Sequence, residues 1–217
     1  MTDIGRQKER AVALSCAPLC DALGRAYSHR LHLHDLIGPP SGTPLFGPAT
    51  TIRFLPLRPD LVDPERHGFD ALARQAAAGA ALGSVLVAAA GQDQPVAGGK
   101  KLAVLAALGL GGLLTDGRVR DLAEADELGI PVWARGEAVR NANDVLMGWE
   151  AGVAVDLAGV TVAPGDWVYA DHSGAVVIPA GAVDSTLDAA EALAAKDART
   201  VADTLARPSH TDAPDRG

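Results

Sequence analysis

The sequence has few cysteines, fewer basic than acidic residues and no long uninterrupted apolar run. Its two cysteines, Cys16 and Cys20, are spaced C-x3-C without a second pair, so they predict two thiols on one helical turn and not a zinc site. Nothing predicts a disulfide-stapled secreted domain. The net charge of −8 argues against a nucleic-acid surface, which needs clustered Lys and Arg. The negative net charge does not exclude a local basic pocket for a small anion.

No segment predicts a signal peptide or a membrane span. The first ten residues are charged and contain no apolar centre. The longest apolar stretch, residues 76–91, is rich in Ala and Gly and is interrupted by Ser84, which predicts the end of a helix followed by a buried strand. We therefore expect a cytoplasmic protein with no membrane partner. A chain of 217 residues that is 48% hydrophobic is long enough to bury its own core.

The middle of the sequence alternates between short apolar strands and helices. The patterns predict strands at 84–90, 111–115 and 132–134, and helices at 69–80, 100–109 and 121–129. This alternation is typical of an α/β fold with a central parallel βαβ unit. Ligands of such units bind beyond the carboxyl ends of the strands. The segments 90–99 and 115–121 are predicted to be loops at such ends, and therefore neighbours.

The flanking segments predict a single domain over residues 1–205 and a disordered tail over 206–217. Pro18 should interrupt a helical region at 5–26, and turn residues alternate with apolar ones over 152–180, which predicts antiparallel β-structure. The remaining expectations are loops at 38–48 and 58–68, a strand at 49–57 and a closing helix at 181–205.

Two glycines stand directly before the helix predicted at 100–109. The backbone amides of Gly98 and Gly99 would be unpaired donors at a helix N-terminus, which is a ready anion site. Lys100 and Lys101 follow in the first turn, where cations oppose the helix dipole, so a bound anion would explain them. The alternative is that both are solvated surface lysines.

The sequence TDGRVRD, residues 115–121, is the densest polar stretch. Asp121 is a candidate helix N-cap, and Glu124 lies three residues on, on the same face. Two such carboxylates can share Mg²⁺ or form half of a capping box. Arg120 could clamp a substrate carboxylate, or it could form an ion pair with Asp116 or Asp121.

These residues form the pattern Gly-Gly, twenty residues, then Arg-Asp-x-x-Glu. With its helices and strands, the pattern resembles the RraA-like family, which includes the regulator of ribonuclease activity A and metal-dependent 4-hydroxy-4-methyl-2-oxoglutarate aldolases. The resemblance extends over four ordered segments, at residues 21–24, 47–54, 111–136 and 159–179.

The resemblance implies a compact single-domain α/β/β fold of the swivelling-domain type, assembled as trimers or hexamers with sites at subunit interfaces. It implies that Asp121 helps to hold Mg²⁺ or Mn²⁺, and we expect Glu124, on the same helix face, to order metal-bound water. It also implies that Arg120 contacts a 2-oxo acid and its enolate. The amides of residues 98–101 would bind the pyruvate carboxylate. A metal and an arginine together would stabilise the charge that develops on the enolate.

One position departs from the family pattern. The aldolases usually carry an acid where this chain has Gly99, and that acid serves the transfer of the substrate's hydroxyl proton. Decarboxylation of oxaloacetate needs the enolate stabilised but has no hydroxyl to deprotonate. We therefore expect a metal-dependent carbon–carbon lyase acting on short 2-oxo dicarboxylic acids, as a decarboxylase or a pyruvate-releasing aldolase. The alternative is a non-catalytic regulator that binds a protein such as a ribonuclease.

Three further motifs lie outside this pattern. His32 and His34 would share one face of a strand, where they could bind a transition metal or simply face solvent. The glycines at 109–113 lead into a strand and lack the full dinucleotide-binding pattern. The sequence Asp-His-Ser at 171–173 cannot form a catalytic triad, and Asp166 and Asp171 are interpreted as turn residues.

Overall fold

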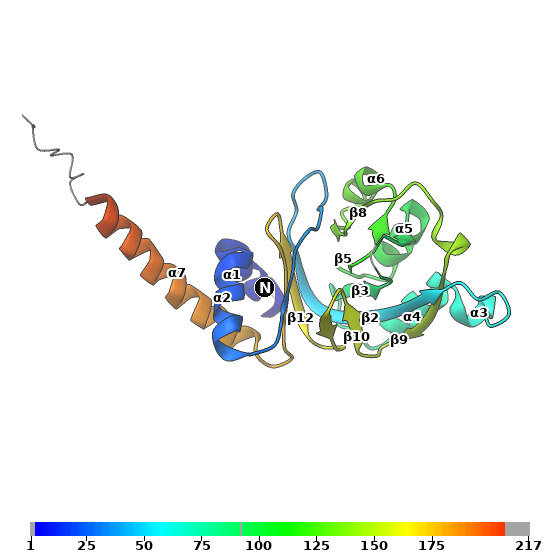
Figure 1. Ribbon diagram of the computed structural model, residues 1–217, viewed down its shortest axis with the longest axis horizontal. Helices are drawn as coiled ribbons and strands as arrows, with labels where there is room; N and C mark the ends of the chain where they lie inside the picture. Colours follow the sequence, from blue (N-terminus) through cyan, green and yellow to red (C-terminus); the bar gives the residue numbers. More distant parts are fainter. Residues whose placement is uncertain (1–2, 92, 207–217) are drawn as a thin grey trace, which may run out of the picture.

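The computed structural model describes residues 3–91 and 93–206 and is built around an eight-stranded mixed sheet (Figure 1). The strand order is β1-β13-β12-β2-β3-β5-β7, and β9 also pairs with β2. These strands are β1 (His32–Leu33), β2 (Leu45–Pro56), β3 (Val85–Ala89), β5 (Gly112–Thr115), β7 (Val132–Trp133), β9 (Leu146–Ala151), β12 (Trp167–Asp171) and β13 (Gly174–Ile178).

The long strand β2 joins two kinds of sheet. Its first part pairs antiparallel with β12, and its second part pairs parallel with β3 and antiparallel with β9. Strands β3, β5 and β7 continue in parallel, as the alternating strand and helix pattern predicted. The antiparallel hairpin β12–β13 confirms the predicted change of pattern in the C-terminal part.

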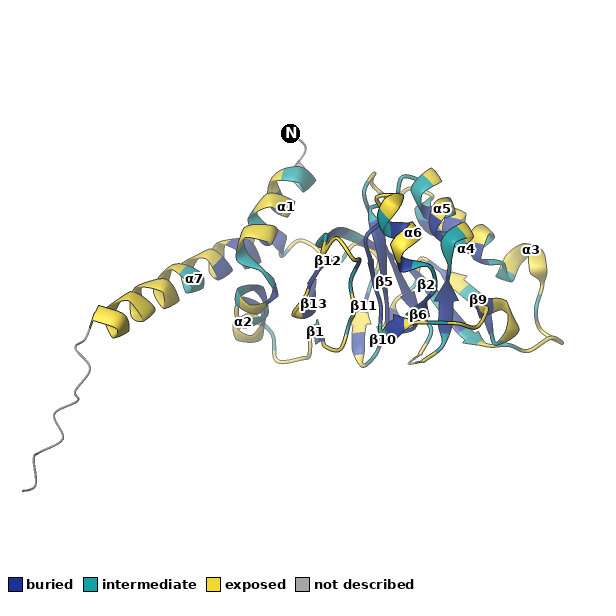
Figure 2. Ribbon diagram, turned by 90° about the horizontal axis from the view of Figure 1, so that it is seen from above, coloured by how far each residue is buried: buried dark blue, intermediate teal, exposed yellow. Residues whose placement is uncertain are grey.

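Helices cover both faces of the sheet, as the sequence predicted for an α/β fold. One group is α1 (Asp3–Leu14), α2 (Cys16–Ala26) and α7 (Val183–Ala206), and the other is α3 (Pro64–His67), α4 (Phe69–Ala77), α5 (Gly99–Ala107) and α6 (Leu122–Glu127). Strand β3 is buried on both sides, because Val85 and Val87 belong to the hydrophobic cluster that contains the first group and the hairpin at residues 155–162, while Leu86 and Ala88 belong to the cluster of the second group. Helix α7 extends well beyond the sheet, and its outer half is exposed (Figure 2).

A second, three-stranded sheet lies beyond the ends of the parallel strands. It consists of β4 (Pro95–Ala97), β6 (Arg118–Val119) and β8 (Gly136–Glu137), all parallel. The predicted loops 90–99 and 115–121 therefore contain short strands, which two or three residues are too few to reveal by periodicity. The prediction that the two segments are neighbours is confirmed by the β4–β6 pairing.

Three other boundaries differ from those predicted. The segment 38–48 is not all loop, because β2 begins at Leu45; Gly47 fits there since a Cβ would lie 2.6 Å from the Gly83 carbonyl oxygen. The first helical region breaks at Ser15, which has φ 69°, and not at Pro18. Pro18 lies in the first turn of α2, where a missing N–H costs no helical hydrogen bond. The predicted loop 58–68 contains helix α3.

Residues 137–150, for which the sequence pattern predicted no element, form the end of β8, the short 3-10 helix η1 (Ala142–Asp144) and most of β9. The hairpin of β10 (Val155–Leu157) and β11 (Val160–Val162) follows. Helix α7 matches the predicted closing helix, while the predicted tail lies outside the described residues except for Ala206. Within the described residues, no helix is both long and apolar enough to span a bilayer.

Candidate functional site

All of the predicted site residues line one cavity of about 540 Å³, which we call the polar cavity. Its wall contains Gly98, Gly99, Lys100, Lys101, Arg120, Asp121 and Glu124, and residues 141–143 of the η1 region contribute as well. The pairing of β4 with β6 brings these segments together, because α5 begins directly after β4 and α6 shortly after β6. The amide of Arg120 donates to the Ala97 carbonyl at 3.0 Å and continues this pairing into the cavity.

Asp121 occupies the N-cap position of α6 but does not cap that helix with its side chain. Its backbone is left-handed, with φ 64° and ψ 40°, and its carboxylate turns toward the neighbouring helix. There Asp121 Oδ2 accepts a hydrogen bond from the Gly99 amide at 2.9 Å. A carboxylate at the N-terminus of α5 also interacts favourably with that helix's dipole. The predicted N-cap residue thus stabilises α5 and not its own helix.

This contact changes the anion site predicted at residues 98–101. The Gly99 amide is already bonded to Asp121, and the Lys101 amide donates to the Gly98 carbonyl at 2.9 Å. Two of the backbone donors expected to bind a substrate carboxylate are therefore engaged by the protein itself. The helix N-terminus attracts a carboxylate as predicted, but in this structure the carboxylate is that of Asp121.

Asp121 and Glu124 approach the same point, as the helical spacing predicted. A Cβ added to Gly99 would lie 2.6 Å from Glu124 Oε2 and 3.6 Å from Asp121 Oδ2. The carboxylate of Glu124 makes no hydrogen bond or ion pair with any other described residue, while its backbone carbonyl accepts from the Leu128 amide at 3.1 Å. The space beside Gly99 that a side chain would fill is thus taken by a carboxylate from α6.

Arg120 borders the same space. Its guanidinium Nη2 lies 3.9 Å from Asp121 Oδ2, and its side chain remains 41% exposed. Of the two ion pairs considered for Arg120, the structure contains the one with Asp121. The donors of this guanidinium that face the cavity remain available to a ligand carboxylate or enolate oxygen.

Asp116 belongs to the framework and not to the cavity. Its side chain is only 3% exposed, and it accepts hydrogen bonds from the amides of Ala90 at 2.8 Å, Gly91 at 3.2 Å and Ala158 at 3.3 Å. Burial raises the pKa of this carboxyl, and the three amides act against that rise. Asp116 therefore ties the end of β3 to the β10–β11 hairpin.

The two lysines have different environments. Lys100 is exposed, whereas Lys101 is half-buried and donates to Asn143 Oδ1 at 3.1 Å and to the Val96 carbonyl at 3.3 Å. Burial lowers the pKa of Lys101, and the charge of Asp70 opposes this effect. No carboxylate of the described residues lies within ion-pair distance of Lys101. The reading as a solvated surface lysine therefore holds for Lys100 but not for Lys101.

The sequence reasoning missed Asn143. This residue lies on η1 and orders the ammonium of Lys101. The run Asn-Ala-Asn-Asp at 141–144 was the available signal, because Asn141 accepts a hydrogen bond from the Asn143 amide at 3.2 Å and starts the turn.

The remaining motifs lie away from the polar cavity. Cys16 and Cys20 are free thiols on α2, as predicted. The rings of His32 and His34 are 4.8 Å apart, but the described residues contain no group of three His, Cys, Asp or Glu side chains able to hold a metal ion. Asp171 accepts hydrogen bonds from the amides of Cys16 and Ser173, at 2.9 and 2.8 Å, and so joins its turn to α2.

The sequence profile of the RraA-like family, described as Aldolase/RraA, matches residues 16–177. This match spans well over half of the chain, so the protein belongs to the RraA-like family.

Among its relatives, a protein of Halalkalibacterium halodurans is 31% identical over 120 residues, which are 54% of this chain and 57% of that protein. A protein of Paraburkholderia phytofirmans is 39% identical over 72 residues, which are 33% of this chain and 43% of that protein. Both are provisionally named 4-hydroxy-4-methyl-2-oxoglutarate aldolases. The chain matches only about half the length of these relatives.

Solved structures agree with the fold. A Streptomyces coelicolor protein, described as an unusual member of the RNase ES inhibitor RraA family, superposes with a TM-score of 0.72 at 26% identity, covering 94% of this chain and 97% of that chain. An uncharacterised protein of Pseudomonas syringae gives a TM-score of 0.74 at 23% identity, covering 96% and 97%. The second likeness is one of fold alone.

Proposed function

We propose that the protein is a divalent-metal-dependent carbon–carbon lyase that acts on short 2-oxo dicarboxylic acids through a pyruvate enolate. The observation that carries this proposal is the convergence of Arg120, Asp121 and Glu124 on the first turn of α5, inside one cavity. A guanidinium beside two carboxylates offers both a binding group for an anion and oxygen ligands for a hard cation. The relatives named as aldolases agree with this chemistry.

The donor set fits Mg²⁺ or Mn²⁺. Mg²⁺ keeps several waters and is commonly held by one or two carboxylates together with the substrate, so it does not require three protein ligands. Asp121 and Glu124 present oxygen atoms to one place beside Gly99. When bound there, the ion would act as a Lewis acid that stabilises charge developing on the substrate's 2-oxo oxygen.

The chain's own residues would perform the remaining tasks. Arg120 would bind the 2-oxo acid and stabilise the enolate oxygen by charge-assisted hydrogen bonds. Lys101, which has no carboxylate partner among the described residues, would attract a second carboxylate. Glu124, whose carboxylate has no partner among residues 3–91 and 93–206, would order water in the cavity and accept the hydroxyl proton that an aldol cleavage releases. Decarboxylation needs no such acceptor, so both reactions remain open to this site.

We include the oligomer in the proposal, as a homotrimer or hexamer with sites near subunit interfaces. The exposed outer half of α7 supports it, because an isolated helical extension of this length is marginal in water without packing. The relevant measurement is the molar mass by light scattering, and a monomer would contradict this part alone.

Pyruvate release tests the function. Purified protein should release pyruvate from oxaloacetate or from 4-hydroxy-4-methyl-2-oxoglutarate with Mg²⁺ or Mn²⁺ present, and EDTA should abolish the release. Decay of oxaloacetate caused by free metal ions is subtracted with a protein-free control. Turnover of oxaloacetate alone would assign a decarboxylase, and turnover of both would assign an aldolase with Glu124 as proton acceptor. No metal-dependent turnover of either would contradict the proposal.

One observation favours a second candidate, a regulator that binds a protein. The Streptomyces coelicolor structure, described as belonging to the RNase ES inhibitor family, covers nearly the whole fold at 26% identity. Oxalate, an enolate mimic, distinguishes the two candidates. A lyase should gain thermal stability from oxalate with Mg²⁺, since a ligand that binds the folded state raises the melting temperature, whereas a pure protein-binding regulator should gain none.

A further inference from the structure

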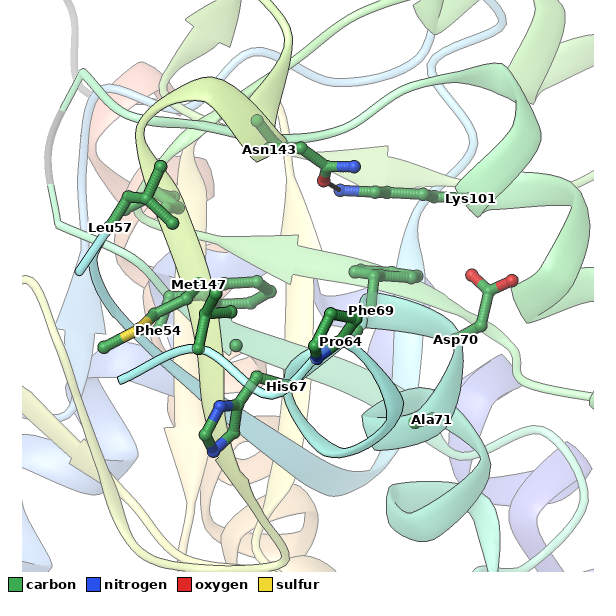
Figure 3. A pocket seen from close by; sticks show the side chains of 15 residues that line it. Phe54, Leu57, Pro64, His67, Phe69, Asp70, Ala71, Lys101, Asn143 and Met147 are labelled. Atoms are coloured by element: carbon green, nitrogen blue, oxygen red, sulfur yellow. Dashed lines mark hydrogen bonds between the residues drawn. The ribbon is translucent and has the colours of Figure 1, made fainter. Parts of the chain in front are cut away.

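A second cavity of about 590 Å³ (Figure 3) adjoins the polar cavity. The two cavities share three lining residues, Lys101, Ala142 and Asn143. They are therefore neighbouring compartments separated by the Lys101–Asn143 hydrogen bond. A cavity of this size lies within the range of about 300–1,000 Å³ that is usual for small-molecule sites.

The wall of the second cavity is mainly apolar. Phe54 from β2, Phe69 from α4 and Met147 from β9 line this cavity (Figure 3). Leu57 and Val62 line it as well. The rings of Phe54 and Phe69 stack at 6.4 Å between centroids. Burial of hydrocarbon against such a wall is favourable in proportion to the area removed from water. The lining thus favours an apolar group over a second charged one.

Lys101 marks the junction between the compartments. Its ammonium is held by Asn143 Oδ1 and the Val96 carbonyl and stands 5.0 Å above the centre of the Phe69 ring. Lys101 lines both cavities, whereas Arg120 lines the polar one and Phe69 the apolar one. One ligand can therefore meet the two cations with its acidic end and the aromatic wall with its other end.

We propose that the second cavity binds a hydrocarbon substituent of the 2-oxo acid whose carboxylate and keto group lie in the polar cavity. The substrate class is then a 2-oxo dicarboxylic acid that also carries an aryl or branched alkyl group larger than a methyl. This inference rests on the proposed function and deepens it, because oxaloacetate alone would leave the second cavity unfilled.

The test compares two ligands that share a 2-oxo carboxylate and differ by one phenyl group. Binding of pyruvate and of phenylpyruvate to the full-length protein with Mg²⁺ is measured by titration calorimetry. Phenylpyruvate should bind at least about tenfold more tightly, since even one methylene in a hydrophobic pocket changes recognition by roughly tenfold or more.

Two neighbouring residues provide a matched pair of variants. Val62 is half-buried and lines the second cavity, while Leu61 is 48% exposed and does not. Val62→Asn should reduce the preference for phenylpyruvate to less than about threefold and leave pyruvate affinity unchanged, since an amide in the wall opposes hydrocarbon burial. Leu61→Asn should retain the wild-type preference. Val62→Thr, which keeps the shape and adds one hydroxyl, replaces the Asn variant if that variant fails to fold.

The outcomes separate this inference from the proposed function. If oxaloacetate is turned over but phenylpyruvate binds no more tightly than pyruvate, the second cavity does not receive the substituent and only the inference is overturned. An unchanged preference in both Val62 variants would also overturn it. If neither ligand binds and no pyruvate is released, the proposed function fails and the inference fails with it.

Discussion

Two aspartates of the same polar stretch, Asp116 and Asp121, have opposite environments. Asp116 follows β5 and is buried, with three backbone amides donating to its carboxylate. Asp121 follows β6, keeps a third of its side chain exposed and lines the polar cavity. Both lie at carboxyl ends of parallel strands, where ligands of α/β proteins are usually found.

The difference shows that position at a strand end is not enough to define a ligand site. Asp116 directly follows β5 of the main sheet. The carboxylate of Asp116 accepts hydrogen bonds from amides that have no partner once the strands have ended. The small sheet β4-β6-β8 lies beyond the main sheet. The polar cavity forms where its strands β4 and β6 end. A carboxylate saturated by backbone amides serves stability, whereas one with unused acceptor capacity can serve a ligand.

The largest expected effect on stability is that of Asp116→Ala. It would leave three partly buried amides without an acceptor, and each unsatisfied buried group costs roughly 1–3 kcal/mol. We expect the free energy of unfolding to fall by about 3 kcal/mol or more, as measured by urea denaturation. Asp121→Ala is the matched control and should cost only about 1 kcal/mol, the usual cost of a lost helix cap. Equal losses in the two variants would break the distinction between framework and site.

The corresponding effect on activity is that of Arg120→Ala. Removal of one preorganised donor to a developing oxyanion costs roughly 10²–10³ in kcat. We expect a loss of that size in pyruvate release, with an unchanged melting temperature. Arg118→Ala is the control, because Arg118 forms an ion pair with Asp93 at 2.7 Å outside the polar cavity. The rate of pyruvate release by this variant should stay within about twofold of the wild-type rate, since most surface substitutions have small effects. Wild-type turnover in Arg120→Ala would show that Arg120 does not bind the substrate or its enolate.

Much of the architecture could be predicted because its signals are local. The parallel unit and the order of its elements could be predicted from two signals. These are the apolar runs that form β3 and β5, and the glycines that follow α4, α5 and α6. The residues of the polar cavity could also be named, because Gly98, Arg120 and Asp121 stand at predicted element ends. The family profile over residues 16–177 confirms the resemblance on which their roles were expected.

The rest depends on contacts between distant segments. Nothing near Asp121 in the sequence indicates that its carboxylate bonds to Gly99, because that contact follows from the β4–β6 pairing. Asn143 and the second cavity depend in the same way on β2, α4 and η1 meeting in space. Short strands such as β4 and β6 are stabilised by their neighbours and not by their own periodicity, so no pattern within them predicts them.

A smaller effect on stability is expected from Gly99→Asp, which tests whether the space beside Asp121 and Glu124 can hold a cation. The new Cβ would meet Glu124 Oε2, the flexible end of a side chain that can rotate away. The cost should therefore be mainly repulsion among three carboxylates, of about 1 kcal/mol per close pair where water screens the charges as strongly as in bulk solution. Gly99→Asn has nearly the same volume without the charge and is the control.

We expect the Asp variant to be less stable than the Asn variant in EDTA, and this difference in melting temperature to shrink or reverse when Mg²⁺ is added, since a cation neutralises the repulsion. A difference that does not respond to Mg²⁺ would argue against a cation beside Asp121 and Glu124.

The smallest effect concerns how two framework carboxylates respond to pH. Burial raises the pKa of Asp171, but hydrogen bonds from the amides of Ser173 and Cys16 outweigh it, so the net shift is downward. A lowered pKa in the folded state contributes stability above the ordinary aspartate pKa of about 4, and this contribution is lost as the pH falls through the folded-state value. Asp171→Asn should therefore flatten the acid limb of the stability curve.

Asp116 has the opposite sign, because its raised pKa contributes stability that is present at low pH and lost as the pH rises through the folded-state value. Asp116→Asn should therefore steepen the acid limb that Asp171→Asn flattens. Urea denaturation between pH 3 and 7, at about half-unit steps, measures both slopes. If both variants changed the slope in the same direction, the hydrogen bonds around one of these carboxylates would differ from those described. The contrast between Asp171, whose pKa is lowered by its hydrogen bonds, and Asp116, whose pKa is raised by burial, would then not hold.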